Sequence, residues 1–184
     1  MMDKGAVSLW LSGLRGAHAL QFDRETERAD FLAALLRSPS AGSWWAIPAD
    51  GGLLSDFELL ENVLLPAQAK GDTRAGTRLR RWLERLKTCG VAPIPLASPL
   101  AALSPWQARV AAFLRAVVAD APALVFDDTC YGLHQEERGQ AVLLHGFFRH
   151  YFPFRPTVYI TLSAPPPELN SPAGNCHRHD TVFA

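Results

Sequence analysis

The stretch from Leu103 to His134 constrains the fold of this chain more strongly than any other. Ser104 is a good helix N-cap, and Pro105 suits the first helical position, where no backbone N–H is needed, so a helix should begin here and continue to about Ala119. After a break, the short apolar run at 123–126 is typical of a buried strand in a parallel sheet. This succession indicates an α/β fold.

Two acidic residues follow this strand at its carboxyl end. Asp127 and Asp128 occupy the edge at which open α/β sheets usually bind ligands. Taken alone, such a pair would more often cap the next turn of the chain. The capped helix that precedes the strand favours a ligand site, so these two acids are the first candidates for catalytic residues.

Periodicity and turn residues predict the other strands and helices. The helix at 72–88 is amphipathic, with a basic outer face of a kind that is usually just solvated. The turn at 49–52 separates two elements. The expected strands are 7–11, 19–22, 44–48 and 157–162, and the expected helices are 24–37, 53–66 (mostly helical), 72–88 and 135–150.

The composition is that of an ordinary globular domain, with 184 residues of which 48% are hydrophobic. Lysine and arginine together number 18, as do aspartate and glutamate, so no overall charge favours nucleic acid or an anionic membrane. Three widely spaced cysteines, at 89, 130 and 176, fit a reducing compartment better than a disulfide framework. The apolar patch within 1–16 is too short to span a membrane and lacks a signal-peptide pattern, so we expect a cytoplasmic protein.

The order of these pieces resembles the nucleotide-binding subunit of ABC transporters: LSxxQ at 103–107, an alanine-rich helix with Arg115, an apolar strand and a double acid. The segment LSPWQARVAAFLRAV, followed by FDD and Gly132, is most similar to the ATPase of Mla-type systems, which move phospholipids between bacterial membranes. The run GGLLSDFELLENVLLP at 51–66 is also similar to that branch. The resemblance covers roughly residues 19–163.

The resemblance implies a P-loop-NTPase-like, three-layer α/β sandwich with a mostly parallel central sheet, shortened at both ends. It implies one domain at 1–163 with a helical subdomain at about 53–104. The remaining residues, 164–184, have no periodicity and are expected to form a flexible proline-rich tail.

The resemblance fails where ATP phosphates should be held. A P-loop needs glycines for its backbone nest and a lysine for the β- and γ-phosphates. Here the residues from Asp23 to Asp30 occupy the expected loop, with Ala29 at the lysine position and Asp30 at the position of the magnesium-binding hydroxyl. No glycine remains, and Asp23 with its acidic neighbours would repel a triphosphate. We therefore expect no ATP or magnesium cofactor.

In the signature motif, the resemblance retains Ser104 and Gln107 as remnants of nucleotide contact. Pro105 and Trp106 replace the two glycines, and the indole of Trp106 is expected to be exposed and to crowd a partner's γ-phosphate.

Four further positions of the site depart from the family pattern. Asp127 matches the metal-organising acid, but Asp128 replaces the usual glutamate with a shorter side chain. The nucleotide-sensing glutamine falls at about Ala49, the D-loop aspartate at His134 and the switch histidine at Leu162.

These replacements together predict a pseudo-ATPase subunit of a bacterial ABC-type transport system for lipids or solvents. We expect it to dock on a permease or on an active ATPase, to reach the inner membrane face only through the permease, and to bind no nucleic acid. Dimerisation stays open. The alternatives are a weak ATPase that uses Asp127 and Asp128 with magnesium, and a stand-alone regulatory module.

Two other groups of cysteine and histidine residues could suggest a chemical site, but we predict none at either. The segment 176–180, CHRHD, carries soft metal ligands but lacks a second spaced pair, so no metal site is expected. Cys130 and His134 have the spacing of a thiol and its base on a helix, but Gly132 argues against a helix there.

Overall fold

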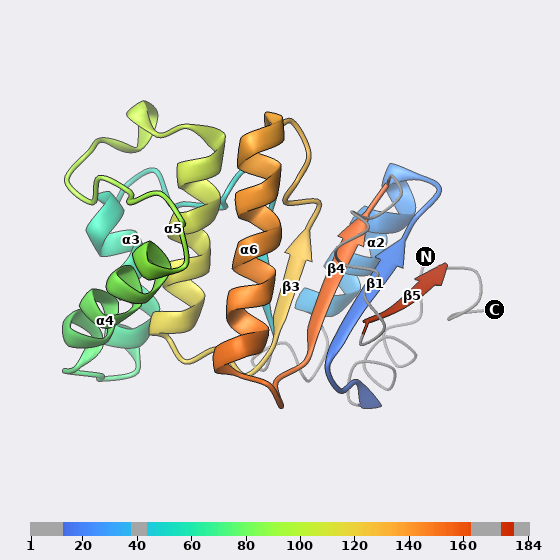
Figure 1. Cartoon of the computed structure of the whole chain (residues 1–184), viewed down its shortest axis with the longest axis horizontal. Helices are drawn as coiled ribbons and strands as arrows, with labels where there is room; N and C mark the ends of the chain where they lie inside the picture. The colour runs from blue at the N-terminus through green and yellow to red at the C-terminus, as the bar shows by residue number, and fades with distance from the viewer. Residues whose placement is uncertain (1–12, 38–43, 163–173, 179–184) are drawn as a thin grey trace. The chain divides into compact units, whose positions relative to one another are not determined.

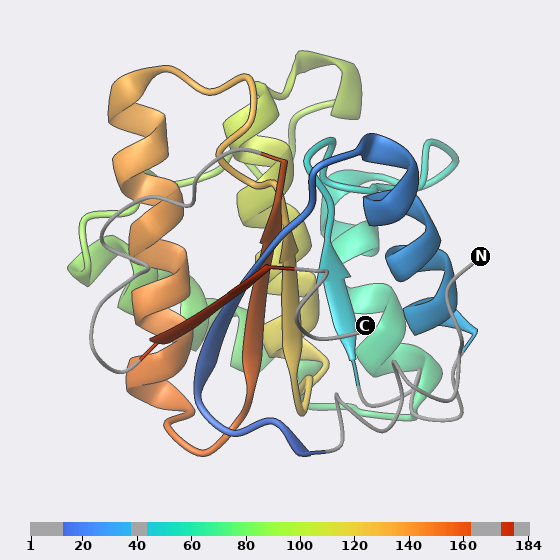
Figure 2. The same ribbon diagram turned by 90° about the vertical axis from the view of Figure 1, so that its right-hand side faces the viewer.

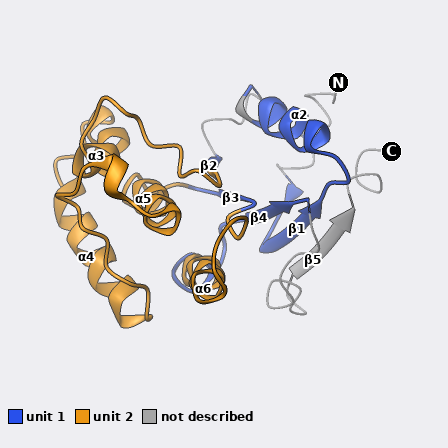
Figure 3. Ribbon diagram, turned by 90° about the horizontal axis from the view of Figure 1, so that it is seen from above, with its two compact units in different colours: residues 1–46, 122–128, 149–184 blue, residues 47–121, 129–148 orange. Residues whose placement is uncertain are grey.

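A computed structural model of the chain describes residues 13–37, 44–162 and 174–178. The chain forms two compact units (Figure 1; Figure 3). Unit 1 contains residues 1–46, 122–128 and 149–184, and unit 2 contains residues 47–121 and 129–148.

A five-stranded sheet dominates unit 1, with the strand order β2-β3-β4-β1-β5. Strand β1 pairs in parallel with β4 and β5, and β4 pairs in parallel with β3, as the common direction of the arrows shows in Figure 2. All residues of β3 and β4 are buried, as expected for inner strands of a parallel sheet. The strands are β1 Ala17–Gln21, β2 Trp45–Ile47, β3 Leu124–Asp127, β4 Thr157–Thr161 and β5 Gly174–Arg178.

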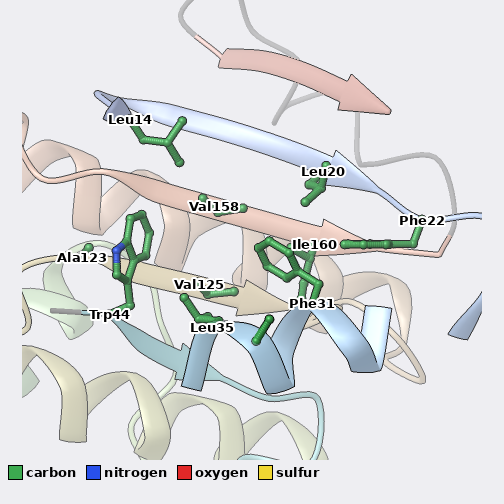
Figure 4. Packing of buried hydrophobic residues seen from close by; sticks show 11 residues of the cluster. Leu14, Leu20, Phe22, Phe31, Leu35, Trp44, Ala123, Val125, Val158 and Ile160 are labelled. Carbon is green, nitrogen blue, oxygen red and sulfur yellow. The ribbon is translucent and has the colours of Figure 1, made fainter. Parts of the chain in front are cut away.

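Helix α2, Glu25–Leu36, packs on this sheet through apolar residues at helical spacing (Figure 4). Phe31 and Leu35 are fully buried in the same cluster as residues of β1, β3 and β4. The rings of Phe31 and Phe22 lie 5.5 Å apart between centroids. Each such buried side chain contributes about 1.5–3 kcal/mol, so this face fixes α2 on the sheet.

Unit 2 is helical. Helix α5 contacts α3 and α4, and the rings of Phe113 and Phe147 lie 5.8 Å apart. Trp82 of α4 meets Phe147 edge-on at 5.7 Å between ring centroids. The helices are α3 Leu59–Ala69, α4 Ala75–Thr88, the short 3-10 helix η2 Leu100–Ala102, α5 Pro105–Val118 and α6 Gln135–Tyr151, whose last three residues belong to unit 1.

The predicted α/β class with its parallel sheet is confirmed, and eight predicted elements appear within a few residues of their expected bounds. The prediction of helix from residue 53 is wrong, because α3 begins only at Leu59. Buried Asn62 instead binds the preceding loop: its side-chain amide donates to the carbonyls of Leu54 and Phe57 at 3.0 Å each. These bonds hold residues 54–57 in a non-helical conformation.

Two sequence predictions concern the ends of the chain. No strand was expected after 162, yet Gly174–Arg178 forms β5, because β1 offers it a parallel partner along its whole length. The expected strand at 7–11 lies outside the described residues. The proposed domain bounds, 1–163 and 164–184, stay predictions.

Candidate functional site

The carboxyl end of β3 carries the two predicted acids in unit 1. Asp127 is the last residue of the strand and is only 6% exposed. Asp128 follows with a φ of 45°, a left-handed conformation that aspartate tolerates better than most residues. Its N–H donates to the carbonyl of Ile160 at 2.8 Å, and its carboxylate accepts a hydrogen bond from the Thr161 hydroxyl at 3.2 Å. The sheet therefore fixes both acids firmly.

Arg28, in the first turn and a half of α2, forms a close ion pair with Asp127. The guanidinium side chain is 16% exposed, and it also donates from Nε to Glu25 at 2.8 Å. Hydrogen bonding to Glu25 raises the pKa of Arg28, and the same contact lowers the pKa of Glu25. A cation supplied by the chain thus lies against the acid for which the resemblance implies a metal-organising role.

Burial governs the ionisation of Asp127. Desolvation raises the pKa of this carboxyl above its ordinary value, and the neighbouring charges of Asp128 and Glu25 act in the same direction. Arg28 opposes them by attraction and hydrogen bonding. Arg28 therefore favours the charged form of a carboxyl whose burial favours the neutral form.

The connection between β1 and α2 is short. Only Phe22, Asp23 and Arg24 separate the strand from the helix, so residues 25–30, which the resemblance aligns with the phosphate-binding loop, belong to the helix predicted at 24–37. Ala29 and Asp30 lie exposed on α2. A P-loop motif has eight residues from its first glycine to the final serine or threonine, and three residues leave no room for such a backbone nest.

The backbone of this connection also lacks the geometry of an anion site. No residue from 22 to 30 has a positive φ, whereas a nest requires left-handed residues. Glu25 and Glu27 occupy the first turn of α2, where their charges already complement the helix dipole. Arg24 at the N-cap donates to the Glu27 carboxylate at 2.8 Å. This helix N-terminus therefore disfavours phosphate.

The signature remnants form a reciprocal cap in unit 2. The Ser104 hydroxyl accepts from the backbone N–H of Gln107 at 3.2 Å, and the Gln107 side chain accepts from the backbone N–H of Ser104 at 2.9 Å. Pro105 occupies the first helical position, as predicted. Both retained residues are thus committed to starting α5.

Trp106 is 4% exposed, so the prediction of an exposed indole is wrong. Its spacing to Val110, Phe113 and Val117 follows one face of a helix, and all of these residues are buried. That spacing could have predicted its burial.

Two arginines of α5 hold the turn at 49–52. The Arg109 guanidinium, almost fully buried, donates from Nε to the carbonyl of Ala49 and from Nη2 to that of Tyr131, both at 2.6 Å. Arg115 donates to the carbonyl of Gly52 at 2.9 Å, and burial lowers the pKa of Arg115. Neither Arg28 nor Arg109 belongs to a recognisable sequence motif. Their partners are distant in sequence, so only the fold reveals them.

Gly51 lets this turn lie directly on α5. Its φ is +83°, and a Cβ at this position would come within 2.8 Å of the Ala108 backbone and side chain. Ala49 occupies the position that the resemblance gives to the nucleotide-sensing glutamine. It is therefore held in place by its bond to Arg109 and by the packing of Gly51 on Ala108.

The remaining candidate positions show no assembled chemistry. His134 is exposed, and its backbone N–H donates to Glu137 at 3.3 Å. Residues 130–134 are not helical and Gly132 has a φ of 69°, so Cys130 and His134 do not share a helix face. Leu162 is partly exposed at the end of β4. Among residues 13–37, 44–162 and 174–178, no three histidine, cysteine or acidic side chains are grouped to hold a metal.

In the described part of the chain, none of the helices combines the length and apolarity needed to cross a bilayer. No protein-family model matches the sequence, and no curated protein matches it either.

Solved structures do match. One is the ATP-binding cassette MJ0796, a dimer in a post-hydrolysis state with ADP and inorganic phosphate: the TM-score is 0.58 at 15% identity, over 80% of this chain and 75% of that chain. Another is an inward-facing structure described as a metal-chelate type ABC transporter, with a TM-score of 0.60 at 16% identity. That match covers 80% of this chain but 63% of the other, less than two thirds of its length. This chain therefore has the α/β, P-loop-NTPase-like fold of ABC-transporter ATP-binding domains.

Proposed function

We propose that this chain is a pseudo-ATPase subunit of an ABC-type transport system, acting by docking to a permease or to an active ATPase. The observation that carries this proposal is the ion pair between Arg28 and Asp127. In an active site of this fold, that acid would organise a magnesium ion bound to ATP. Here the guanidinium of Arg28 supplies the positive charge that a magnesium ion would supply beside Asp127.

The β1–α2 connection supports the same conclusion from the phosphate side. Its three residues and the acidic first turn of α2 offer neither a nest nor a lysine for a triphosphate. Two independent requirements for nucleotide are therefore unmet in unit 1. We expect neither ATP nor magnesium to act as a cofactor.

The finer parts of the proposal rest on the sequence resemblance alone. The sequence of residues 103–117 and the motif FDD at 126–128 favour a lipid or solvent transport system of the Mla type in bacteria. A subunit of that kind would act at the cytoplasmic face of the inner membrane.

Titration with a fluorescent ATP analogue in the presence of magnesium tests the loss of nucleotide binding. We expect no saturable signal, and phosphate release from ATP at the background rate. Co-purification of the tagged chain with an ABC permease and an active ATPase from the same organism tests docking. Failure to associate with either would refute the docking role.

A weak ATPase is the alternative, favoured by one observation: Asp127 and Asp128 both remain at the carboxyl end of β3. In that case ATP would bind, and Asp127→Ala would abolish the binding. Such a result would replace the pseudo-ATPase proposal with an enzyme.

A further inference from the structure

The turn between α6 and β4 presents the most exposed large apolar side chain among the described residues. Phe154 is 90% exposed. It lies in a tight turn in which the N–H of Arg155 donates to the carbonyl of Phe152 at 3.0 Å, with Pro153 at the second position. A proline there restricts the backbone in advance, so the phenyl ring is held outward at little entropic cost.

The turn is anchored to the sheet of unit 1. The carbonyl of Pro156 accepts from the N–H of Leu124, and the N–H of Thr157 donates to the carbonyl of Gly16 at 2.8 Å. The guanidinium of Arg155 stacks over the ring of Phe152, 4.3 Å from its centroid. A cation therefore lies next in sequence to the exposed Phe154, in a turn that hydrogen bonds join to the sheet.

The described acidic residues of unit 1 lie on α2 and at one edge of its sheet, away from the opposite edge. Because β1, β3 and β4 are parallel, their amino ends meet at one edge, where the α6–β4 turn also lies (Figure 1; Figure 2). That edge, which we call the basic edge, carries Arg15 just before β1, together with Arg149 and Arg155. No acidic residue occurs in 13–22 or in 149–162. The described acids of unit 1 are Asp23, Glu25, Glu27, Asp30, Asp127 and Asp128, on α2 and at the carboxyl ends of β1 and β3.

We propose that the basic edge of unit 1 binds directly to the surface of an anionic phospholipid bilayer. Phe154 enters the boundary between headgroups and acyl chains, while Arg15, Arg149 and Arg155 meet the lipid phosphates. An apolar tip with cations behind it is the arrangement by which proteins lie on a membrane without spanning it. An acidic protein surface would match the charges as well, and the competition described below tests it. This inference does not depend on the proposed function.

Another exposed aromatic side chain supplies a contrast. Phe57 is 37% exposed, but it lies between Asp56 and Glu58, both exposed. Carboxylates beside the ring repel anionic headgroups, so this position should contribute nothing to lipid binding. Phe57→Ala is therefore a matched control for Phe154→Ala.

Flotation of the full chain with vesicles tests the proposal. With vesicles of phosphatidylcholine containing phosphatidylglycerol we expect binding that weakens as salt is raised, and with phosphatidylcholine alone little binding. Phe154→Ala should lower the partition coefficient by about tenfold, as expected for one buried phenyl ring. Arg155→Gln should lower it by about fivefold, the contribution of one arginine near such a surface. Circular dichroism checks that each variant is folded.

Several outcomes would overturn the proposal. One is the absence of binding to phosphatidylglycerol vesicles at low salt. Another is binding that Phe57→Ala weakens as much as Phe154→Ala does. Binding that is unchanged by both Phe154→Ala and Arg155→Gln would place the lipid contact elsewhere. An acidic polypeptide could abolish vesicle binding of the original chain but leave the residual binding of Phe154→Ala unchanged. That result would assign the edge to a protein partner instead.

Discussion

The N-termini of α5 and α2 are built in opposite ways. At α5, Ser104 and Gln107 cap each other within four residues. At α2, the N-cap Arg24 makes no side-chain capping bond, and the important contact joins Arg28 to Asp127, 99 residues further along the chain. The first is local and neutral, whereas the second is long-range and charged.

This difference shows which helix terminus could lose nucleotide binding while the chain keeps its fold. The α5 cap depends only on its own sequence, so it persists whether or not a nucleotide is ever bound. The α2 terminus depends on the charge of another strand. Once a guanidinium neutralises Asp127 from within, the sheet edge is stable without metal or phosphate.

Removing the long-range partner should have the largest effect. Arg28→Ala leaves the buried Asp127 without its cation, and we expect a loss of about 3 kcal/mol in the free energy of unfolding at pH 7. Urea denaturation measures it. Arg24→Ala is the control, because that exposed pair should contribute less than about 1 kcal/mol. Equal losses in both variants would contradict a special role for Arg28.

Acid should reverse most of that loss. Burial raises the folded-state pKa of Asp127, so its contribution to stability is complete below its unfolded pKa and is lost as pH rises through the folded value. Removing Arg28 raises the folded pKa further and enlarges the loss at neutral pH. Urea denaturation between pH 3.5 and 7, which brackets the ordinary aspartate value of about 3.9, should show the two proteins diverging as pH increases. Parallel curves would exclude Asp127 as the cause.

The packing over the local terminus can be tested at Gly51. Gly51→Ala would bring a Cβ within 2.8 Å of Ala108 at a positive φ, so we expect a loss of about 1–2 kcal/mol in unfolding free energy. Gly76→Ala is the matched control, because its Cβ would meet nothing within 4 Å and alanine favours the helix. Thermal unfolding compares the two. A neutral Gly51→Ala would show that the turn can move away from α5.

The cap itself should show the smallest effect. Ser104→Ala removes one hydrogen bond to the start of α5, and we expect a loss of about 1 kcal/mol with little dependence on pH. Ser55→Ala, at an exposed loop position, is the control. A pH-dependent loss in Ser104→Ala would contradict the neutral character of this terminus.

Local chemistry explains which elements could be predicted from the sequence. Ser104 and Pro105 specify a helix start by their own hydrogen-bonding groups, and the apolar run of β3 specifies a buried strand. The acids at 127 and 128 were found because a strand end is visible in sequence. Arg28 on α2 could not be found in this way, because its partner Asp127 lies on β3, far away in the sequence. Strand β5 was missed for the same reason: its hydrogen bonds come from β1 rather than from its own pattern.

The ion pair of Arg28 also has a consequence for how unit 1 responds to its surroundings. A metal ion or a nucleotide occupies a site to a degree set by its concentration. A guanidinium attached to the same chain is present once per site and cannot be diluted. The charge at the carboxyl end of β3 is thus balanced at a constant stoichiometry, whatever the supply of magnesium or nucleotide around the protein.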